Sequence, residues 1–133
     1  MAVEKFTTVG RGPQPRSQHS AAVFGSYFVV FGGRSNNIFS ESMKNVAFND
    51  LHLLNISSRE WVSLALFGEE LPESRWGHSM VATNSSILLF GGMNLKHYCP
   101  SAVYEFSFNQ KKLKRYLKQK TLRTTNLVKK EES

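Results

Sequence analysis

The feature that most constrains this chain is a repeat within its own sequence. Residues 15–34 align with residues 74–93 at an offset of 59, and residues 49–61 align with residues 101–113 at an offset of 52. The identical positions in the two copies include Arg16/Arg75, His19/His78, Ser20/Ser79, Phe31/Phe90, Gly32/Gly91 and Gly33/Gly92. Because one repeat is one structural unit that buries its faces against its neighbours, the sequence predicts two similar units in succession.

Each copy is predicted to form short antiparallel strands. In the first copy the candidate strands are residues 19–24, 27–31, 50–56 and 60–64, with tight turns at Gly25-Ser26 and Ser57-Ser58. In the second copy the counterparts are residues 78–83, 87–90 and 102–108, the last with alternating aromatic and polar residues. A long polar loop is expected between the second and third strands of each copy. No helix is needed before residue 110, so the sequence predicts an all-β chain.

The basic character of the chain comes from its C-terminus. The formal net charge is +7, yet residues 1–110 carry eight Lys+Arg and eight Asp+Glu. The excess lies in residues 111–133, whose most concentrated basic residues are Lys111, Lys112, Lys114, Arg115 and Lys118. Three interpretations stay open for this tail: a solvated extension, a poor outer strand, or a short helix with Leu113, Tyr116 and Leu117 at helical spacing.

Composition excludes several classes of protein. A single cysteine, Cys99, rules out a disulfide framework, and four scattered histidines form no cluster at metal-ligand spacing. The N-terminus has no apolar signal segment, and no apolar run approaches the roughly 18 residues that cross a membrane. We therefore expect a cytoplasmic protein, with the nucleus as an alternative, that is not secreted and holds no metal or cofactor.

These motifs resemble the kelch repeat. The matching elements are the entry segment with proline, arginine and His-Ser, the apolar strand closed by two glycines, the Asn-Asp-Leu start of the third strand, and Trp61 in the fourth strand. The resemblance covers roughly residues 6–113. It implies an all-β, partial kelch-type β-propeller of two four-stranded antiparallel blades, followed by the basic tail. Leu54, Phe106 and Leu113 stand where the family has Tyr, Tyr and Trp.

This resemblance divides the chain into four parts. They are an outer-strand-like N-terminal segment (1–14), a first repeat (15–64), a second repeat (65–113) and a basic, flexible tail (114–133). Propellers close with about 4 to 8 blades, so two blades leave unpaired edges and an apolar face. We expect either a fragment or short isoform of a larger ring, or several copies that associate to complete one.

Two sets of residues are candidates for function and structure. The long connections are predicted to share one end of the blades, and the candidate partner contacts there are Arg34, Asn36, Asn37, Lys44, Asn94, Lys96 and His97. A residue that recurs in every blade is more simply explained by the blade's own hydrogen bonding than by binding or catalysis. The residues to which we assign this structural role are Arg16, His19, Gly32, Gly33, Trp61, Arg75, His78, Gly91 and Gly92.

No set of residues has the pattern of a catalytic site. The His-Ser neighbours do not place an imidazole as the base for the adjacent hydroxyl, and the glycines follow no phosphate-loop spacing. The sequence therefore predicts a non-catalytic protein-interaction module, and the resemblance implies scaffold or adaptor work, as in substrate receptors of ubiquitin ligases and cytoskeletal binders. The alternative is binding of nucleic acid or an anionic surface through the tail; we expect a protein partner instead. A third hypothesis is an enzyme, because a minority of kelch-like propellers belong to enzymes.

Overall fold

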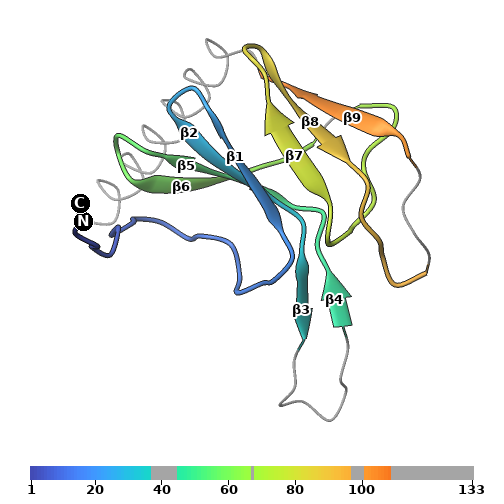
Figure 1. The fold of residues 1–133 in the computed structure, drawn as a ribbon, viewed down its shortest axis with the longest axis horizontal. Helices are drawn as coiled ribbons and strands as arrows, with labels where there is room; N and C mark the ends of the chain where they lie inside the picture. Colours follow the sequence, from blue (N-terminus) through green and yellow to red (C-terminus); the bar gives the residue numbers. More distant parts are fainter. Residues whose placement is uncertain (37–44, 67, 97–100, 109–133) are drawn as a thin grey trace, which may run out of the picture.

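The computed structural model describes residues 1–36, 45–66, 68–96 and 101–108. These residues form β-strands and no helix (Figure 1). The strands are β1 (Ser20–Phe24), β2 (Tyr27–Phe31), β3 (Arg34–Asn36), β4 (Asn45–Ala47), β5 (Leu51–Asn55), β6 (Glu60–Leu64), β7 (Ser79–Ala82), β8 (Ser86–Phe90) and β9 (Val103–Ser107). The seven strands whose ranges the sequence predicted all occur, and each end lies within one residue of the predicted position.

The first sheet is a four-stranded antiparallel meander in the order β1-β2-β5-β6. Its short connections lie at one end, and the second of them is closed by a side chain. The Oδ1 atom of Asn55 accepts hydrogen bonds from the backbone N–H groups of Ser57 and Ser58, at 3.0 and 3.1 Å. Asparagine side chains close turns in this way, and the turn holds β6 in register with β5.

The second sheet contains three antiparallel strands in the order β7-β8-β9. It reproduces the first three strands of the first sheet, with Phe90 paired to Ser79 as Phe31 is paired to Ser20. A fourth strand was expected up to Leu113, and residues 109–113 lie outside the described part of the chain.

The long loop expected at residues 34–49 contains a short hairpin instead. Strand β3 pairs antiparallel with β4, with Arg34 opposite Ala47 and Ser35 opposite Val46. These three-residue strands are mostly polar and lack alternating hydrophobic residues, so the sequence carried no strand signal there. Their pairing rests on the backbone hydrogen bonds of the ladder.

The N-terminal segment lies against the outer strand of the first sheet. The N–H of Val9 donates to the Arg59 carbonyl at 2.8 Å, and the N–H of Trp61 donates to the Val9 carbonyl at 2.9 Å, in a parallel bridge. The Arg59 guanidinium lies 4.1 Å from the centre of the Phe6 ring. A cation–π contact of this kind adds to the hydrogen bonds, so the segment extends the outer edge of the sheet.

The core lies between the two sheets. Val29, Phe31 and Leu53 on one face of the first sheet are buried, and they pack with Ile87 and Leu89 of β8. Aromatic rings of β9 complete the contact, since the ring centres of Phe31 and Phe106 lie 5.4 Å apart. Each sheet therefore covers the apolar face that the other would leave in water.

Backbone hydrogen bonds fix the inner edges of the two sheets to each other. The N–H of Gly33 donates to the Arg75 carbonyl at 2.8 Å, and the N–H of Gly77 donates to the Gln18 carbonyl at 2.9 Å. Gly33 has a φ of +96°, and a Cβ atom there would lie 2.8 Å from the Ser17 carbonyl oxygen. Only glycine fits both requirements, which explains why the second glycine of the pair recurs.

We expect Leu53→Ala to lower the free energy of unfolding by about 3 kcal/mol, because it removes a buried side chain from the contact between the sheets. Ile56→Ala is the matched control, since Ile56 is exposed at the β5–β6 turn and should change stability by less than about 0.5 kcal/mol. Urea unfolding followed by circular dichroism measures both. Equal losses in the two variants would contradict a core between the sheets.

Candidate functional site

An arginine–aspartate pair ties together three segments of the first sheet. The Nη1 and Nη2 atoms of Arg16 donate to the two carboxylate oxygens of Asp50 at 2.6 and 2.9 Å, and Nη1 also donates to the Gly32 carbonyl at 2.9 Å. The guanidinium lies 4.0 Å from the centre of the Phe48 ring. The pair therefore holds the entry of β1, the end of β2 and the start of β5 at fixed positions.

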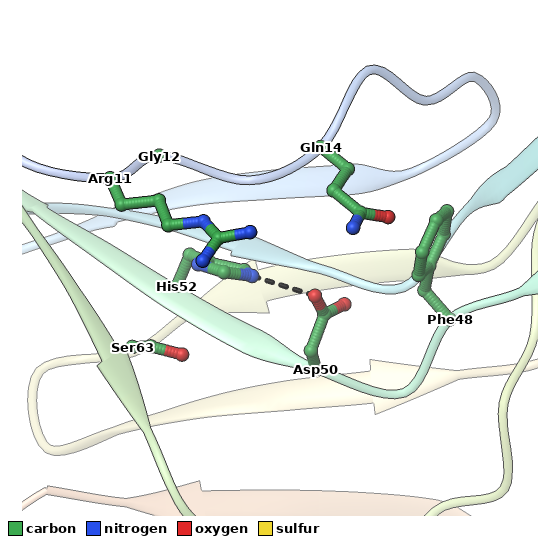
Figure 2. A pocket seen from close by; sticks show the side chains of 7 residues that line it. All are labelled: Arg11, Gly12, Gln14, Phe48, Asp50, His52 and Ser63. Atoms are coloured by element: carbon green, nitrogen blue, oxygen red, sulfur yellow. Dashed lines mark hydrogen bonds and ion pairs between the residues drawn. The ribbon is translucent and has the colours of Figure 1, made fainter.

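Asp50 also accepts a hydrogen bond from His52. The Nε2 atom of His52 lies 2.6 Å from Oδ2 of Asp50, which orients the imidazole toward the carboxylate (Figure 2). Burial alone raises the pKa of the Asp50 carboxyl, but the hydrogen bonds and positive charges of Arg16 and His52 outweigh burial. The net result is a pKa below the ordinary value, so Asp50 is a carboxylate at neutral pH.

A hollow of about 420 Å³ lies beside this pair, under the N-terminal segment (Figure 2). It is lined by Arg11, Gly12, Gln14, Phe48, Asp50, His52 and Ser63. Ser63 is directly opposite His52 in the β5–β6 ladder. However, within the described residues the Nδ1 atom of His52 has no hydrogen-bond partner, so the imidazole does not activate the serine hydroxyl.

The second repeat carries the same arginine without the carboxylate. Nε of Arg75 donates to the Glu73 carbonyl at 3.1 Å and Nη1 donates to the Gly91 carbonyl at 3.0 Å, as the equivalent atoms of Arg16 do with Gln14 and Gly32. Ala102 stands at the position that aligns with Asp50. The Nη2 atom of Arg75 is consequently buried with no partner among the described residues.

His78 connects the two sheets through its side chain. Its Nε2 atom lies 2.9 Å from the Phe31 carbonyl oxygen and, because a carbonyl only accepts, must carry the proton. The pKa of His78 is lowered to about 4: burial is the main cause, the hydrogen bond to the Phe31 carbonyl opposes it, and the charges of Arg75 and His19 act in the same direction as burial. The imidazole is therefore neutral at pH 7. His19, its counterpart in the first repeat, is exposed.

The remaining repeat residues differ in their surroundings. Gly12 lies on the indole of Trp61, since a Cβ at residue 12 would be 3.1 Å from the indole Nε1. A Cβ at Gly92 would lie 2.8 Å from the Trp76 carbonyl oxygen, which repeats the close approach at Gly33. At Gly91, in contrast, a Cβ would meet no described atom within 4 Å.

The candidate partner contacts lie in two long connections. Arg34 and Asn36 are in β3, while Asn94 and Lys96 are between β8 and β9; Asn37, Lys44 and His97 lie outside the described residues. The β3–β4 hairpin and the β8–β9 connection extend from the same end of the sheets, opposite the β1–β2 turn (Figure 1). We call this end the long-connection end. The basic tail residues Lys111, Lys112, Lys114, Arg115 and Lys118 also lie outside the described part.

The long-connection end has a hollow of its own, of about 400 Å³. It is lined by Glu73, Ser74, Asn94, Leu95 and Lys96. The Nδ2 atom of Asn94 donates to a carboxylate oxygen of Glu73 at 2.9 Å, and the backbone N–H of Lys96 donates to Oδ1 of Asn94 at 2.9 Å. These bonds shape the connection, and they leave the Leu95 side chain 61% exposed beside two charged residues.

Sequence reasoning missed the partners of the repeated arginines. It assigned Arg16 and Arg75 the same structural role, whereas only Arg16 has a carboxylate. The signal was present in the alignment at offset 52, which places Ala102 over Asp50. In the described ranges no helix is long and apolar enough to cross a membrane, and no three His, Cys, Asp or Glu side chains gather as metal ligands.

We expect opposite effects from exchanging the residues at positions 50 and 102. Asp50→Ala removes the carboxylate from a buried guanidinium and should lower the free energy of unfolding by about 2 kcal/mol. Ala102→Asp supplies the missing partner of Arg75 and should raise the melting temperature by about 4 °C. Thermal unfolding of both variants checks this, with Ala102→Asn as the uncharged control. A lower melting temperature for Ala102→Asp would show that Arg75 needs no carboxylate.

We expect the stability to depend on pH through His78. The unfolded chain protonates this residue near pH 6.5, whereas the folded chain does so only near pH 4. Between these values the unfolded state binds more protons, so stability is lost as the pH falls from about 6.5 to about 4, by about 3 kcal/mol in total. His78→Gln keeps a donor for the Phe31 carbonyl and should flatten this slope in urea titrations. Ile56→Ala, at an exposed position in the β5–β6 turn, should leave the slope unchanged.

Comparisons with known proteins agree with the repeated motifs. A family model described as the KLHDC2/KLHL20/DRC7 Kelch-repeats domain matches residues 1–126. Tip elongation aberrant protein 1 of Schizosaccharomyces pombe is 36% identical over 101 residues, which is 74% of this chain and 8% of that protein. Kelch domain-containing protein 1 of Mus musculus is 38% identical over 86 residues, which is 64% of this chain and 19% of that protein.

A solved structure shows the same fold. The chain in "Structure of YjhT" superposes with a TM-score of 0.50 at 30% sequence identity, over 60% of this chain and 22% of that one. The chain thus spans less than a quarter of the length of these relatives. The prediction of an all-β, kelch-type propeller architecture is confirmed. Because the family model matches almost the whole length, the chain belongs to the kelch-repeat family.

Proposed function

We propose that this chain is a non-catalytic protein-interaction module that holds a protein partner at the long-connection end, in the cytoplasm or the nucleus. The observation that carries the proposal is the hollow beside Leu95. There, an exposed apolar side chain stands between Glu73 and Lys96, on connections that two packed sheets hold in place. An apolar anchor surrounded by polar groups is the arrangement that dominates binding energy at protein interfaces.

Kelch repeats generally serve as protein-interaction scaffolds, which supports the same proposal. The unclosed blade edges are a second surface, and the partner we propose for them is another copy of this chain. The alternative function, binding of nucleic acid or an anionic surface, depends on the tail alone, because residues 1–110 carry no net charge.

A photo-crosslinking residue distinguishes these functions. We expect p-benzoylphenylalanine at position 95 to form a discrete adduct with a cellular protein, and the same residue at position 57, in the β5–β6 turn, to form none. Leu95→Asp combined with Lys96→Ala should reduce capture of that protein at least tenfold, with an unchanged melting temperature. Deletion of residues 111–133 should leave the adduct intact. Loss of the adduct on that deletion would favour the alternative function.

A further inference from the structure

We propose that a second copy of this chain docks head-to-tail on the outer face of the second sheet, with its residues 15–19 and β1 occupying the place that a following blade would take. This inference deepens the part of the proposed function that concerns the unclosed edges. It uses residues 15–19, β1 and Gly91, and not the hollow beside Leu95, so different substitutions test the two proposals. The contact between the two sheets within one chain provides the geometry from which it is argued.

The first argument is the exposure of equivalent residues. On the face of the first sheet that meets the second, Phe31 is 0% exposed and Leu51 is 2% exposed. Their counterparts on the second sheet, Phe90 and Val103, are 51% and 59% exposed. The outer face of the second sheet thus leaves uncovered the counterparts of two side chains that are covered within the chain, while the exposed Glu105 stands where the first sheet has Leu53.

The second argument concerns the first glycine of each pair. Gly32 and Gly91 have nearly the same backbone conformation, with φ of +67° and +74°. A Cβ at Gly32 would lie 2.7 Å from Cε1 of His78, whereas a Cβ at Gly91 would meet no described atom within 4 Å. The position that an imidazole fills over Gly32 is therefore open over Gly91 among the described residues.

The third argument is that the chain carries an unused copy of the group that fills this space. His78 packs on Gly32 and donates its Nε2 proton to the Phe31 carbonyl at 2.9 Å. His19 occupies the same position in the first repeat and is exposed. In the second copy, His19 would pack on Gly91 of the first copy and donate to its Phe90 carbonyl.

Apolar side chains beside this bond extend the contact. Within one chain β1 lies beside β7, and in the assembly β7 of one copy would lie beside β1 of the next (Figure 1). Val81 on β7 and Val23 on β1 are each more than half exposed in the single chain. Val30 and Leu54, farther from this edge, are already buried within the chain, so the contact is confined to residues 15–19 and β1.

The two complementary surfaces lie on different parts of one chain, so the interface is heterologous. Repeating such a contact gives a closed ring when the rotation allows it. A ring of 4 to 8 blades would contain about two to four copies of this two-repeat chain.

Two variants test the proposal in light scattering across a size-exclusion peak. The full chain at tens of micromolar should have the mass of about two to four copies. His19→Ala removes the donor of one copy and should raise the dissociation constant at least tenfold. Gly91→Ala places a methyl group where the imidazole of the next copy packs, and should give monomers. Ile56→Ala, exposed at the far turn, is the control and should not change the mass.

Mixing the variants gives a sharper outcome. His19→Ala retains an intact Gly91 face, and Gly91→Ala retains an intact His19, so an equimolar mixture should form a dimer that neither variant forms alone. A symmetric interface would show no such complementation. A monomeric wild-type chain, or an oligomer that neither substitution weakens, would overturn the proposal.

Discussion

The contact between the two sheets is the constraint on which the rest of the structure depends. Neither sheet can bury its own apolar face, because each is a single layer whose side chains alternate between two sides. The contact is closed at the core by Phe31 and Ile87, and at the inner edge by the bond from Gly33 to the Arg75 carbonyl. The glycines are required because the second sheet approaches the backbone of the first more closely than a Cβ permits.

The two repeated arginines have the same position in their repeats but different electrostatic surroundings. Arg16 is neutralised by Asp50 in a bidentate pair, and His52 adds a further hydrogen bond to the carboxylate. Arg75 donates to the equivalent carbonyls of the second repeat. Where the first repeat has the imidazole of His52, the second has the ring of Tyr104, whose centre lies 5.2 Å from the Arg75 guanidinium. The positive charge of Arg75 then contributes to keeping the neighbouring His78 neutral. Among the described residues, hydrogen bonds and packing thus hold the second repeat at this position, and no ion pair does.

Most of the fold could be predicted because each strand of the repeat unit has a recognisable pattern in both copies of the sequence. The apolar strand before Gly32 and its copy before Gly91 gave the sheet positions, and alternation in residues 103–107 gave β9. The β3–β4 hairpin could not be predicted, since a polar ladder of backbone bonds leaves no periodic pattern. The pairing of Arg16 with Asp50 spans 34 residues, and nothing local to either residue indicates it. The candidate hollow at Leu95 depends on how two connections meet, which spacing does not encode.

The difference between the two repeats also indicates where binding surfaces can arise. A residue of the repeated motif is buried where it packs against the other sheet, as His78 and Phe31 are. Their counterparts His19 and Phe90 are exposed, and in the proposed head-to-tail contact they are the recognition groups. An exposed residue of the repeated motif therefore indicates a different kind of partner from an exposed loop residue such as Leu95. The motif residue fits a partner that packs as another blade does, whereas the loop residue does not define the fold of its partner.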